Sequence, residues 1–417
     1  MYFLAEYLQN KGFELNVVHS KGKFYGDFGM PVKFHRIPIG KNSPTDTSHG
    51  SSSNPENRIQ QITIKNAKFF LQKSNLSFFE NLIFNDPNPW MGIIGYLFVR
   101  NARNAILKTI KDRAIKFVII SGPPFLLFSI APVIKKHFPD VKIIFDYRDP
   151  WNTMRSPYVS TLLEKKYLRF ADRFVFLNDR MLKDSVLKYG LPETRCETVL
   201  NGYSIKDWNE VQEEFLDSPR NTMPANNRMV ILCIGSGNFG VGGIRDIATF
   251  FDSFEIFQKN KKILLRFVGI TPSKESEEVK QRFSSNIEII SAVSLHTSFK
   301  YMLDSDILIL IHTKEETAKY VLTGKLFDYI RSGKVIFGIG KKDTYFLDFI
   351  ALYKLGLVCD NQSVEILRNL ELLYKHWEEG TLNQIRQNVG LNIEDYSRDG
   401  QNAKYLKILQ SFYLDGK

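Results

Sequence analysis

Short apolar runs alternate with helical segments along most of this chain, and they do so in two separate series. The first series has its runs at residues 117–120, 142–146 and 173–177. A second series begins at residues 229–234 and includes residues 307–311. Strands that alternate with helices build parallel βαβ units, whose ligand-binding loops follow the carboxyl ends of the strands. The pattern therefore predicts an α/β protein with two Rossmann-like domains.

The chain of 417 residues is long enough for two domains of ordinary size. We expect an N-terminal domain over residues 1–203 and a second domain over residues 229–395. The acidic and polar residues 204–228 between them are predicted to be a linker. Residues 396–417 are predicted to form a C-terminal helix that packs back toward the N-terminal domain.

Composition restricts the class of protein. A hydrophobic content of 43% favours a chain that forms a core over a disordered one. The three cysteines show no pairing pattern, which favours a reducing compartment, and we expect the protein in the cytoplasm. No apolar run reaches the roughly 18 residues that a membrane-spanning helix needs.

The net charge of +11 fits a partner that carries negative charge, such as a phosphate-bearing substrate, an anionic membrane or nucleic acid. No RNA- or DNA-reading motif occurs, so nucleic acid is not expected as a partner. The basic helix predicted at residues 100–116 and the aromatic-rich residues 69–90 favour peripheral contact with the inner face of a membrane. A buried amphipathic helix explains their apolar residues equally well.

The segment TGKLFDYIRSG, residues 323–333, lies between two predicted strands. Thr323 leads into a helical pattern in which Lys325 comes early and Asp328 follows one turn later, on the same face. The free N–H groups of a helix start, with a lysine beside them, can hold a pyrophosphate, and a nearby carboxylate can hold its ribose. A surface helix with an incidental ion pair is the alternative.

The turn GSGNFG follows the first strand of the second domain and matches the G-x-G-x-x-G pattern with Gly235, Gly237 and Gly240. This keeps an NAD-binding domain as an alternative. That fingerprint also needs an acidic residue at the end of the next strand, and the strand ILLRFVGI has none there. More generally, a glycine-rich turn lets backbone N–H groups approach a phosphate, and Arg245 can add charge.

The segment DYRDPW follows a strand of the first domain and contains Arg148 and Asp149. Asp149 can serve as a base or hold a sugar hydroxyl, and Arg148 can pair with phosphate. A structural Asp–Arg pair is the alternative. The D-x-D at residues 304–306 precedes a strand, whereas a metal-holding D-x-D should follow one, so a turn is favoured. The histidines lack metal-ligand spacing, and we expect no metal.

Together these segments resemble the GT-B glycosyltransferases, in particular glycosyltransferase family 4. In the first domain the similarity rests on SGPP, DYRDPW, ADRFVFLNDRMLKD and VLNG. In the second domain it rests on GSGNFGVGG, LRFVGI, MLDSDILILI and TGKLFDYIRSGKVIFGIG. The order of these motifs covers nearly the whole chain.

The resemblance implies two Rossmann-like domains that face each other across a cleft, with the nucleotide sugar on the C-terminal domain. It implies a retaining transfer from a UDP- or GDP-sugar to a glycan or lipid-linked acceptor in surface polysaccharide synthesis, with no bound metal or cofactor. The leaving pyrophosphate then needs protein cations and helix N-termini. Lys325, Arg245 and the glycine turn are the candidates for that role.

The chain departs from the family pattern at two places. Many members carry two glutamates eight residues apart, but Tyr320 and Asp328 stand at those positions here. Members also open with a strand and a glycine-rich loop, whereas this sequence opens with a predicted helix. A truncated or inactive relative that acts as a binding subunit is therefore the first alternative function, and an NAD-dependent oxidoreductase is the second.

Overall fold

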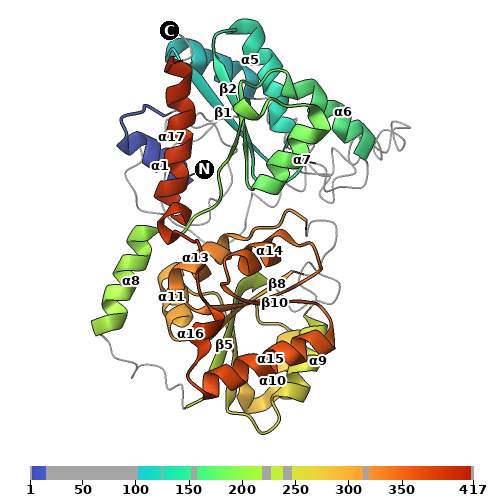
Figure 1. Cartoon of the computed structure of the whole chain (residues 1–417). Coiled ribbons are helices and arrows are strands. Elements are labelled where there is room, and N and C mark those ends of the chain that lie inside the picture. Colours follow the sequence, from blue (N-terminus) through green and yellow to red (C-terminus); the bar gives the residue numbers. More distant parts are fainter. Residues whose placement is uncertain are drawn as a thin grey trace, which may run out of the picture. The chain divides into compact units, whose positions relative to one another are not determined.

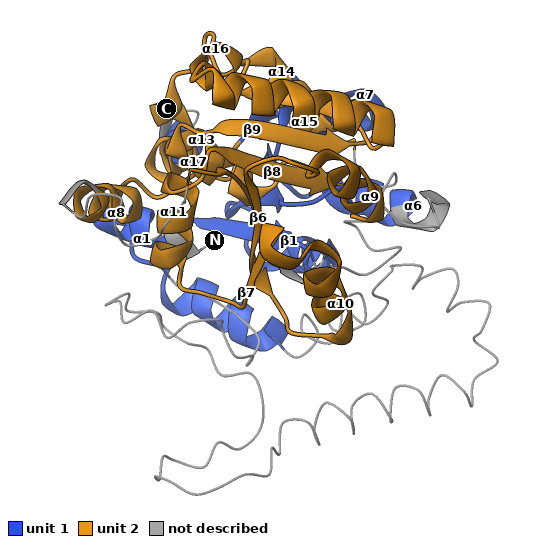
Figure 2. Cartoon of the chain, turned by 90° about the horizontal axis from the view of Figure 1, so that it is seen from below, with its two compact units in different colours: residues 1–198, 406–417 blue, residues 199–405 orange. Residues whose placement is uncertain are grey.

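The computed structural model describes residues 2–15, 102–123, 125–151, 157–217, 227–237, 247–312 and 319–414. The chain divides into two compact units, which Figure 2 shows in different colours. Unit 1 comprises residues 1–198 with residues 406–417, and unit 2 comprises residues 199–405. The α/β class predicted from the alternating pattern is confirmed.

Unit 1 contains a parallel sheet with the strand order β1-β2-β3-β4. Its strands are β1 (Phe117–Gly122), β2 (Lys142–Tyr147), β3 (Arg173–Phe176) and β4 (Cys196–Thr198). Helices connect the strands: η1 (Phe125–Ile130), α5 (Ala131–His137), α6 (Pro157–Leu168), α7 (Asp179–Tyr189) and η2 (Glu193–Arg195). Also present are α1 (Tyr2–Asn10) and a helix over residues 102–112.

Unit 2 contains a six-stranded parallel sheet with the order β10-β9-β8-β5-β6-β7. Its strands are β5 (Met229–Gly237), β6 (Ile263–Ile270), β7 (Ile287–Ile290), β8 (Ile307–His312), β9 (Val335–Gly340) and β10 (Gly356–Asp360). The strand order reverses between β5 and β8, which are neighbours although β6 and β7 separate them along the chain. In doubly wound sheets, ligands bind beyond the carboxyl ends of the strands at such a reversal.

Helices cover both faces of the unit 2 sheet (Figure 1). One face packs against α9 (Ala248–Phe257), α10 (Lys274–Phe283) and α15 (Ser363–Glu378). The other packs against α8 (Ile205–Asp217), α11 (Leu295–Leu303), α13 (Gly324–Ser332) and α14 (Tyr345–Leu352). Buried strands between two helical layers read as continuous apolar runs, and ILILI is one of them. Alternate residues of β8 join each face: Ile307 and Ile309 pack on one, Leu308 and Leu310 on the other.

The helix α8 occupies part of the segment that we expected to be a linker. It is amphipathic, and Trp208 and Val211 on its apolar face are buried in the core of unit 2. The Trp208 ring stacks on Phe299 of α11, with the ring centroids 4.3 Å apart. The acidic residues of this segment suggested a solvated linker, but Glu210, Glu213 and Glu214 lie on the exposed face of a packed helix.

The chain after residue 380 packs against the first residues of unit 2, where Ser397 pairs with Tyr203. It includes α16 (Leu382–Ile385), η4 (Ile393–Tyr396) and α17 (Arg398–Leu414). Gly202 of the VLNG motif lies directly against it: a Cβ at Gly202 would come 2.5 Å from the backbone nitrogen of Arg398. Only glycine fits such a close approach of two backbones. The end of α17 belongs to unit 1, where Phe412 stacks on Phe117 at 5.7 Å.

Candidate functional site

The strands β5 and β8 separate as they approach their carboxyl ends. They pair only at Ile231 with Ile307 and at Leu232 with Leu308. Beyond these pairs, β5 has an irregularity in register between Ile234 and Gly237, which places an extra residue opposite β6. The two strands separate where the order of the sheet reverses. Lys325 and Tyr329 of α13 contact the strands at this point.

Tyr329 of α13 bridges the two separating strands. Its hydroxyl accepts a hydrogen bond from the Ile234 nitrogen and donates one to the Ile309 oxygen, each over 3.3 Å. Its side chain is fully buried. Because backbone groups that leave a sheet ladder need new partners, the tyrosine stabilises the opening between β5 and β8. Tyr329 was not among the residues predicted for the site, because its only signal in the sequence is a phenol on the apolar face of the helix.

Lys325 lies one turn before Tyr329 and reaches the same strand. Its Nζ donates a hydrogen bond to the Ile234 oxygen over 2.6 Å. The side chains of Lys325 and Tyr329 therefore use both backbone groups of Ile234, next to the irregular turn that contains Gly235 and Gly237. The structure thus brings three of the predicted donor-site residues together: Gly235, Gly237 and Lys325.

The first turn of α13 is open. Thr323 is the N-cap residue, but its side chain makes no capping bond, and its buried Oγ1 has no hydrogen-bond partner among the described residues. A Cβ built on Gly324 would meet no described atom within 4 Å. Buried hydroxyls normally have a partner, so this hydroxyl is a candidate contact for a bound molecule. The first N–H groups of a helix attract anions, and here Lys325 adds a cation.

Asp328, the predicted ribose ligand, packs against α8. Its Oδ1 accepts a hydrogen bond from Trp208 Nε1 over 3.1 Å. Burial raises the pKa of Asp328 to about 6, while the Trp208 hydrogen bond and the Arg398 charge act to lower it and the Asp207 charge acts to raise it. Keeping Asp328 ionised in the folded protein therefore costs free energy. Residues at binding sites often have a pKa shifted in this way. Its role toward ribose remains a prediction.

Arg386 fixes the other end of α13. Its guanidinium donates to the backbone oxygens of Ile330 over 2.7 Å, Tyr329 over 3.2 Å and Lys334. A cation that satisfies the last carbonyls of a helix also interacts favourably with the helix dipole. Burial lowers the pKa of Arg386 to about 10. The helix that carries Lys325 is thus anchored by a residue that sequence analysis gave no reason to select.

In unit 1, the segment DYRDPW forms the carboxyl end of β2 and the turn after it. Asp146 is fully buried; its Oδ2 accepts from Ser121 Oγ over 2.7 Å, and its Oδ1 lies 3.5 Å from Arg148 Nη1. Trp151 stacks on Phe125, with ring centroids 5.1 Å apart. The structural Asp–Arg pair left open by the sequence is therefore present, and it uses Asp146.

Asp149, the predicted catalytic carboxylate, stays at the surface of unit 1. Desolvation of its carboxylate by neighbouring protein atoms raises its pKa, and the charge of Arg148 acts to lower it. Its residue is exposed, whereas Arg148 is partly buried. A raised pKa brings a carboxyl group nearer to the range where it can exchange protons at neutral pH. Asp149 and Arg148 are thus neighbours at the carboxyl end of β2, as the sequence indicated.

Comparison with solved structures identifies the architecture. A glycosyltransferase from Rickettsia africae ESF-5 matches with a TM-score of 0.64 at 12% identity, over 99% of this chain and 93% of that one. Sucrose-phosphate synthase from Thermosynechococcus elongatus matches with a TM-score of 0.61 at 10% identity, over 99% and 92%. HepE from Anabaena, solved with UDP, matches with a TM-score of 0.57 at 11% identity, over 74% and 82%. The fold is GT-B. No protein-family model matches the sequence, and no curated protein matches it either.

Within this GT-B fold, two of the predicted donor-site residues, Gly240 and Arg245, lie outside the described residues. Tyr320 is described, and Lys319 lies over its ring at 5.2 Å. In the described ranges, no three side chains of histidine, cysteine, aspartate or glutamate converge as ligands of a metal would. Among the described helices, none combines the length and the apolar character that crossing a bilayer requires.

The D-x-D of the second domain has the structural role that its position indicated. Asp304 is the C-cap residue of α11 and forms an ion pair with the buried Arg266 over 3.0 Å. Asp306 accepts a hydrogen bond from the Val230 nitrogen over 2.8 Å, at the amino end of the sheet. Both carboxylates therefore stabilise the turn into β8, away from the strand ends where the ligand loops lie.

Proposed function

We propose that this protein is a glycosyltransferase that transfers a sugar from a UDP- or GDP-sugar to a glycan or lipid-linked acceptor. The observation that carries the proposal is the convergence of Lys325, the open first turn of α13 and the irregular end of β5 at the strand reversal. The GT-B fold and the UDP complex of HepE support a nucleotide diphosphate as part of the donor. The nucleotide diphosphate is expected to bind there in unit 2.

The chemistry that these groups can perform is stabilisation of a leaving group. When the bond between the anomeric carbon and the diphosphate breaks, negative charge builds up on the diphosphate oxygens. Lys325 and the free N–H groups of α13 are fixed in place before that charge develops, which is the most effective form of electrostatic catalysis. We propose a retaining transfer in which these protein groups, and no metal, neutralise the charge.

In unit 1, we propose that Asp149 binds a hydroxyl of the acceptor and that Arg148 holds its orientation. The raised pKa of Asp149 favours its use in proton exchange. Replacing Asp149 with asparagine is then expected to lower kcat for transfer about 100-fold, while the affinity for UDP stays unchanged. Transfer assays and calorimetry on the same preparation measure both quantities. An unchanged kcat would remove Asp149 from the mechanism.

The pathway and the cellular site remain part of the proposal. Surface polysaccharide synthesis in the cytoplasm, with contact to the inner face of an anionic membrane, agrees with the net charge of +11. The NAD-dependent alternative is not favoured, because β6 ends in Gly269 and Ile270 with no carboxylate to hold a ribose. An inactive binding subunit would bind the same nucleotide as a transferase, and only an assay of sugar transfer would distinguish the two.

Heat unfolding in the presence of nucleotides tests the proposed function. A ligand that binds only the folded state stabilises it by RT ln(1 + [L]/Kd), which is about 2.7 kcal/mol at a concentration of 100 Kd. We expect UDP or GDP to raise the Tm by several degrees, whereas AMP at the same concentration should not. If neither UDP nor GDP shifts the transition at millimolar concentration, the proposed donor is wrong. Sugar transfer to candidate acceptors then distinguishes an enzyme from a binding subunit.

A further inference from the structure

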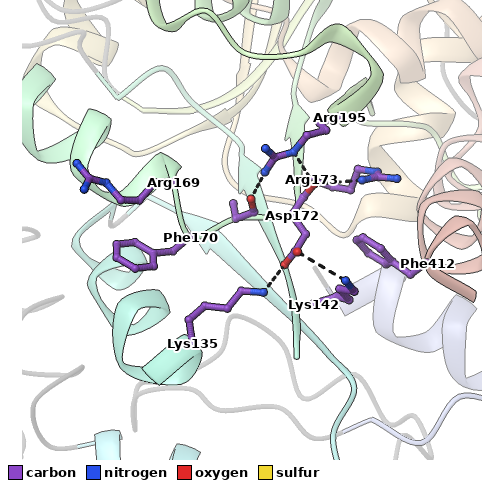
Figure 3. A pocket seen from close by; sticks show the side chains of 9 residues that line it. Lys135, Lys142, Arg169, Phe170, Asp172, Arg173, Arg195 and Phe412 are labelled. Carbon is purple, nitrogen blue, oxygen red and sulfur yellow. Dashed lines mark hydrogen bonds and ion pairs between the residues drawn. The ribbon is translucent and has the colours of Figure 1, made fainter. Parts of the chain in front are cut away.

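Unit 1 contains a cavity of about 350 Å³ that the glycosyl-transfer proposal does not use. Five cationic side chains and one carboxylate line it among the described residues (Figure 3). The cations are Lys135, Lys142, Arg169, Arg173 and Arg195, and the carboxylate is Asp172. The aromatic rings of Phe170 and Phe412 and the methyl group of Ala171 complete the lining. The charged groups that line the cavity thus sum to +4.

The position of this basic pocket separates it from the predicted catalytic residues. Lys142 and Arg173 begin β2 and β3, and Arg195 directly precedes β4, so the pocket lies at the amino end of the sheet. Asp149 and Arg148 follow β2 at its carboxyl end. A function for the pocket is therefore independent of the sugar-transfer chemistry.

Among the described residues, the contacts of Lys142, Arg169 and Arg195 do not cancel the positive charge that these side chains bring to the pocket. The Asp172 carboxylate accepts a hydrogen bond from Lys135 Nζ over 2.8 Å and another from the Ile143 nitrogen over 2.8 Å. Arg195 donates instead to neutral backbone oxygens, among them the oxygen of Asp172. A neutral carbonyl orients a guanidinium but does not cancel its charge.

In the part of the chain that the structure describes, Lys142 has one weak charged partner and Arg169 has none. Lys142 Nζ lies 3.9 Å from Asp172 Oδ1 and its side chain is 43% exposed. Arg169 is exposed and makes no hydrogen bond or ion pair with a described residue. Keeping several like charges around one concave surface is unfavourable without an anion, because each charge raises the free energy of the others. Both side chains remain available to such an anion.

We propose that the basic pocket binds a phosphate group. Guanidinium groups match the oxygens of phosphate with paired hydrogen bonds, and lysines add charge without a fixed geometry. The group can belong to a soluble phosphorylated molecule or to the headgroup of an anionic lipid. In both cases Phe170 and Phe412 lie beside it and offer apolar contact to whatever carries the phosphate.

The test uses the full chain and a double variant, Lys142→Gln with Arg169→Gln. These two side chains carry none of the backbone contacts that hold the pocket together, so the fold should persist. The matched control is Lys183→Gln with Lys188→Gln, which removes two exposed charges from α7 of the same unit. Heat unfolding of both double variants checks that each is folded.

Two binding measurements distinguish the source of the phosphate. Calorimetry with inorganic phosphate, against sodium chloride of equal ionic strength, measures binding of a free anion. Flotation with vesicles of phosphatidylglycerol and phosphatidylcholine, against phosphatidylcholine alone, measures binding of a lipid headgroup. The wild-type protein should bind in at least one of these two measurements. In that measurement the Lys142→Gln/Arg169→Gln variant should bind about tenfold more weakly, and the Lys183→Gln/Lys188→Gln control should match the wild type.

Each outcome decides the proposal. Selective loss of phosphate binding supports a soluble ligand, and selective loss of vesicle binding supports a lipid. Equal losses in the two double variants would show that only overall charge matters, and would overturn the pocket as a site. Absence of wild-type binding in both measurements would overturn it as well. Shifts of Tm by UDP or GDP report on unit 2 and are unaffected by any of these results.

Discussion

Replacing Lys325 with methionine is expected to lower kcat/KM for sugar transfer about 100-fold, since removing one fixed donor from a developing negative charge commonly has an effect of this size. Methionine keeps much of the length and apolar contact of the side chain but lacks its charge. The lost hydrogen bond to the Ile234 oxygen should reduce stability by only about 1 kcal/mol. Steady-state kinetics with the preferred donor sugar measures the first effect, and heat unfolding measures the second.

The control for this experiment is Lys274→Met. The Lys274 side chain is 90% exposed on α10, so the substitution removes the same charge without touching the site. Both kinetic constants of this control should stay close to those of the wild type. If Lys325→Met keeps wild-type kcat/KM, the diphosphate does not lie at the start of α13.

Replacing Asp328 with asparagine is expected to stabilise the protein and to weaken nucleotide binding. On folding, the pKa of Asp328 rises from 3.8 to about 6, which costs about 3 kcal/mol of stability at pH 7. Because the folded-state pKa is the higher one, the stability contributed by the protonated group is complete below pH 3.8 and is lost as the pH rises through about 6. Asparagine still accepts the Trp208 hydrogen bond but never acquires the charge.

The gain in stability for Asp328→Asn should therefore be small below about pH 4 and reach its full size above about pH 6. Chemical denaturation across this range measures it, with the exposed Asp140→Asn as a control that should show no such trend. If the carboxylate also holds the ribose, the affinity for UDP or GDP should fall about tenfold or more at pH 7. A variant that is stabilised but binds nucleotide normally would make Asp328 a structural residue only.

The sequence predicted the central strands of unit 2 closely, because their apolar runs are clear. The predicted runs at residues 229–234 and 307–311 lie within β5 and β8, and α13 is capped by Gly333, whose φ of 77° is a left-handed conformation that favours glycine. The helix α8 was missed because its acidic outer face dominated the composition. Its core contacts, Trp208 with Phe299 among them, join residues that are far apart in the sequence.

The candidate site was predicted less completely than the fold. Lys325 could be predicted because a lysine at the start of a helix favours binding of an anion, and both features are visible in a short stretch of sequence. The partner of Asp328 is Trp208, which lies 120 positions away, and no local pattern indicates such a contact. The bridging role of Tyr329 also depends on how β5 and β8 separate, and this is a property of the sheet.

Several residues in the motifs that resemble glycosyltransferases serve the fold. Asn178 caps α7 by accepting from the Met181 nitrogen over 2.8 Å, and Ser121 holds the buried Asp146. Gly202 permits the close approach of the chain near Arg398. These positions explain why the motifs predicted the GT-B fold well, although they carry little information about the donor or the acceptor.

The most direct test of the central claim is the position of bound nucleotide. A crystal structure of the protein with UDP or GDP should show the diphosphate at the first turn of α13, within hydrogen-bond distance of Lys325 Nζ and close to the end of β5. Thr323 Oγ1 should then have a partner. Nucleotide bound elsewhere on the protein, or an empty α13 terminus at a saturating concentration, would contradict the proposed donor site.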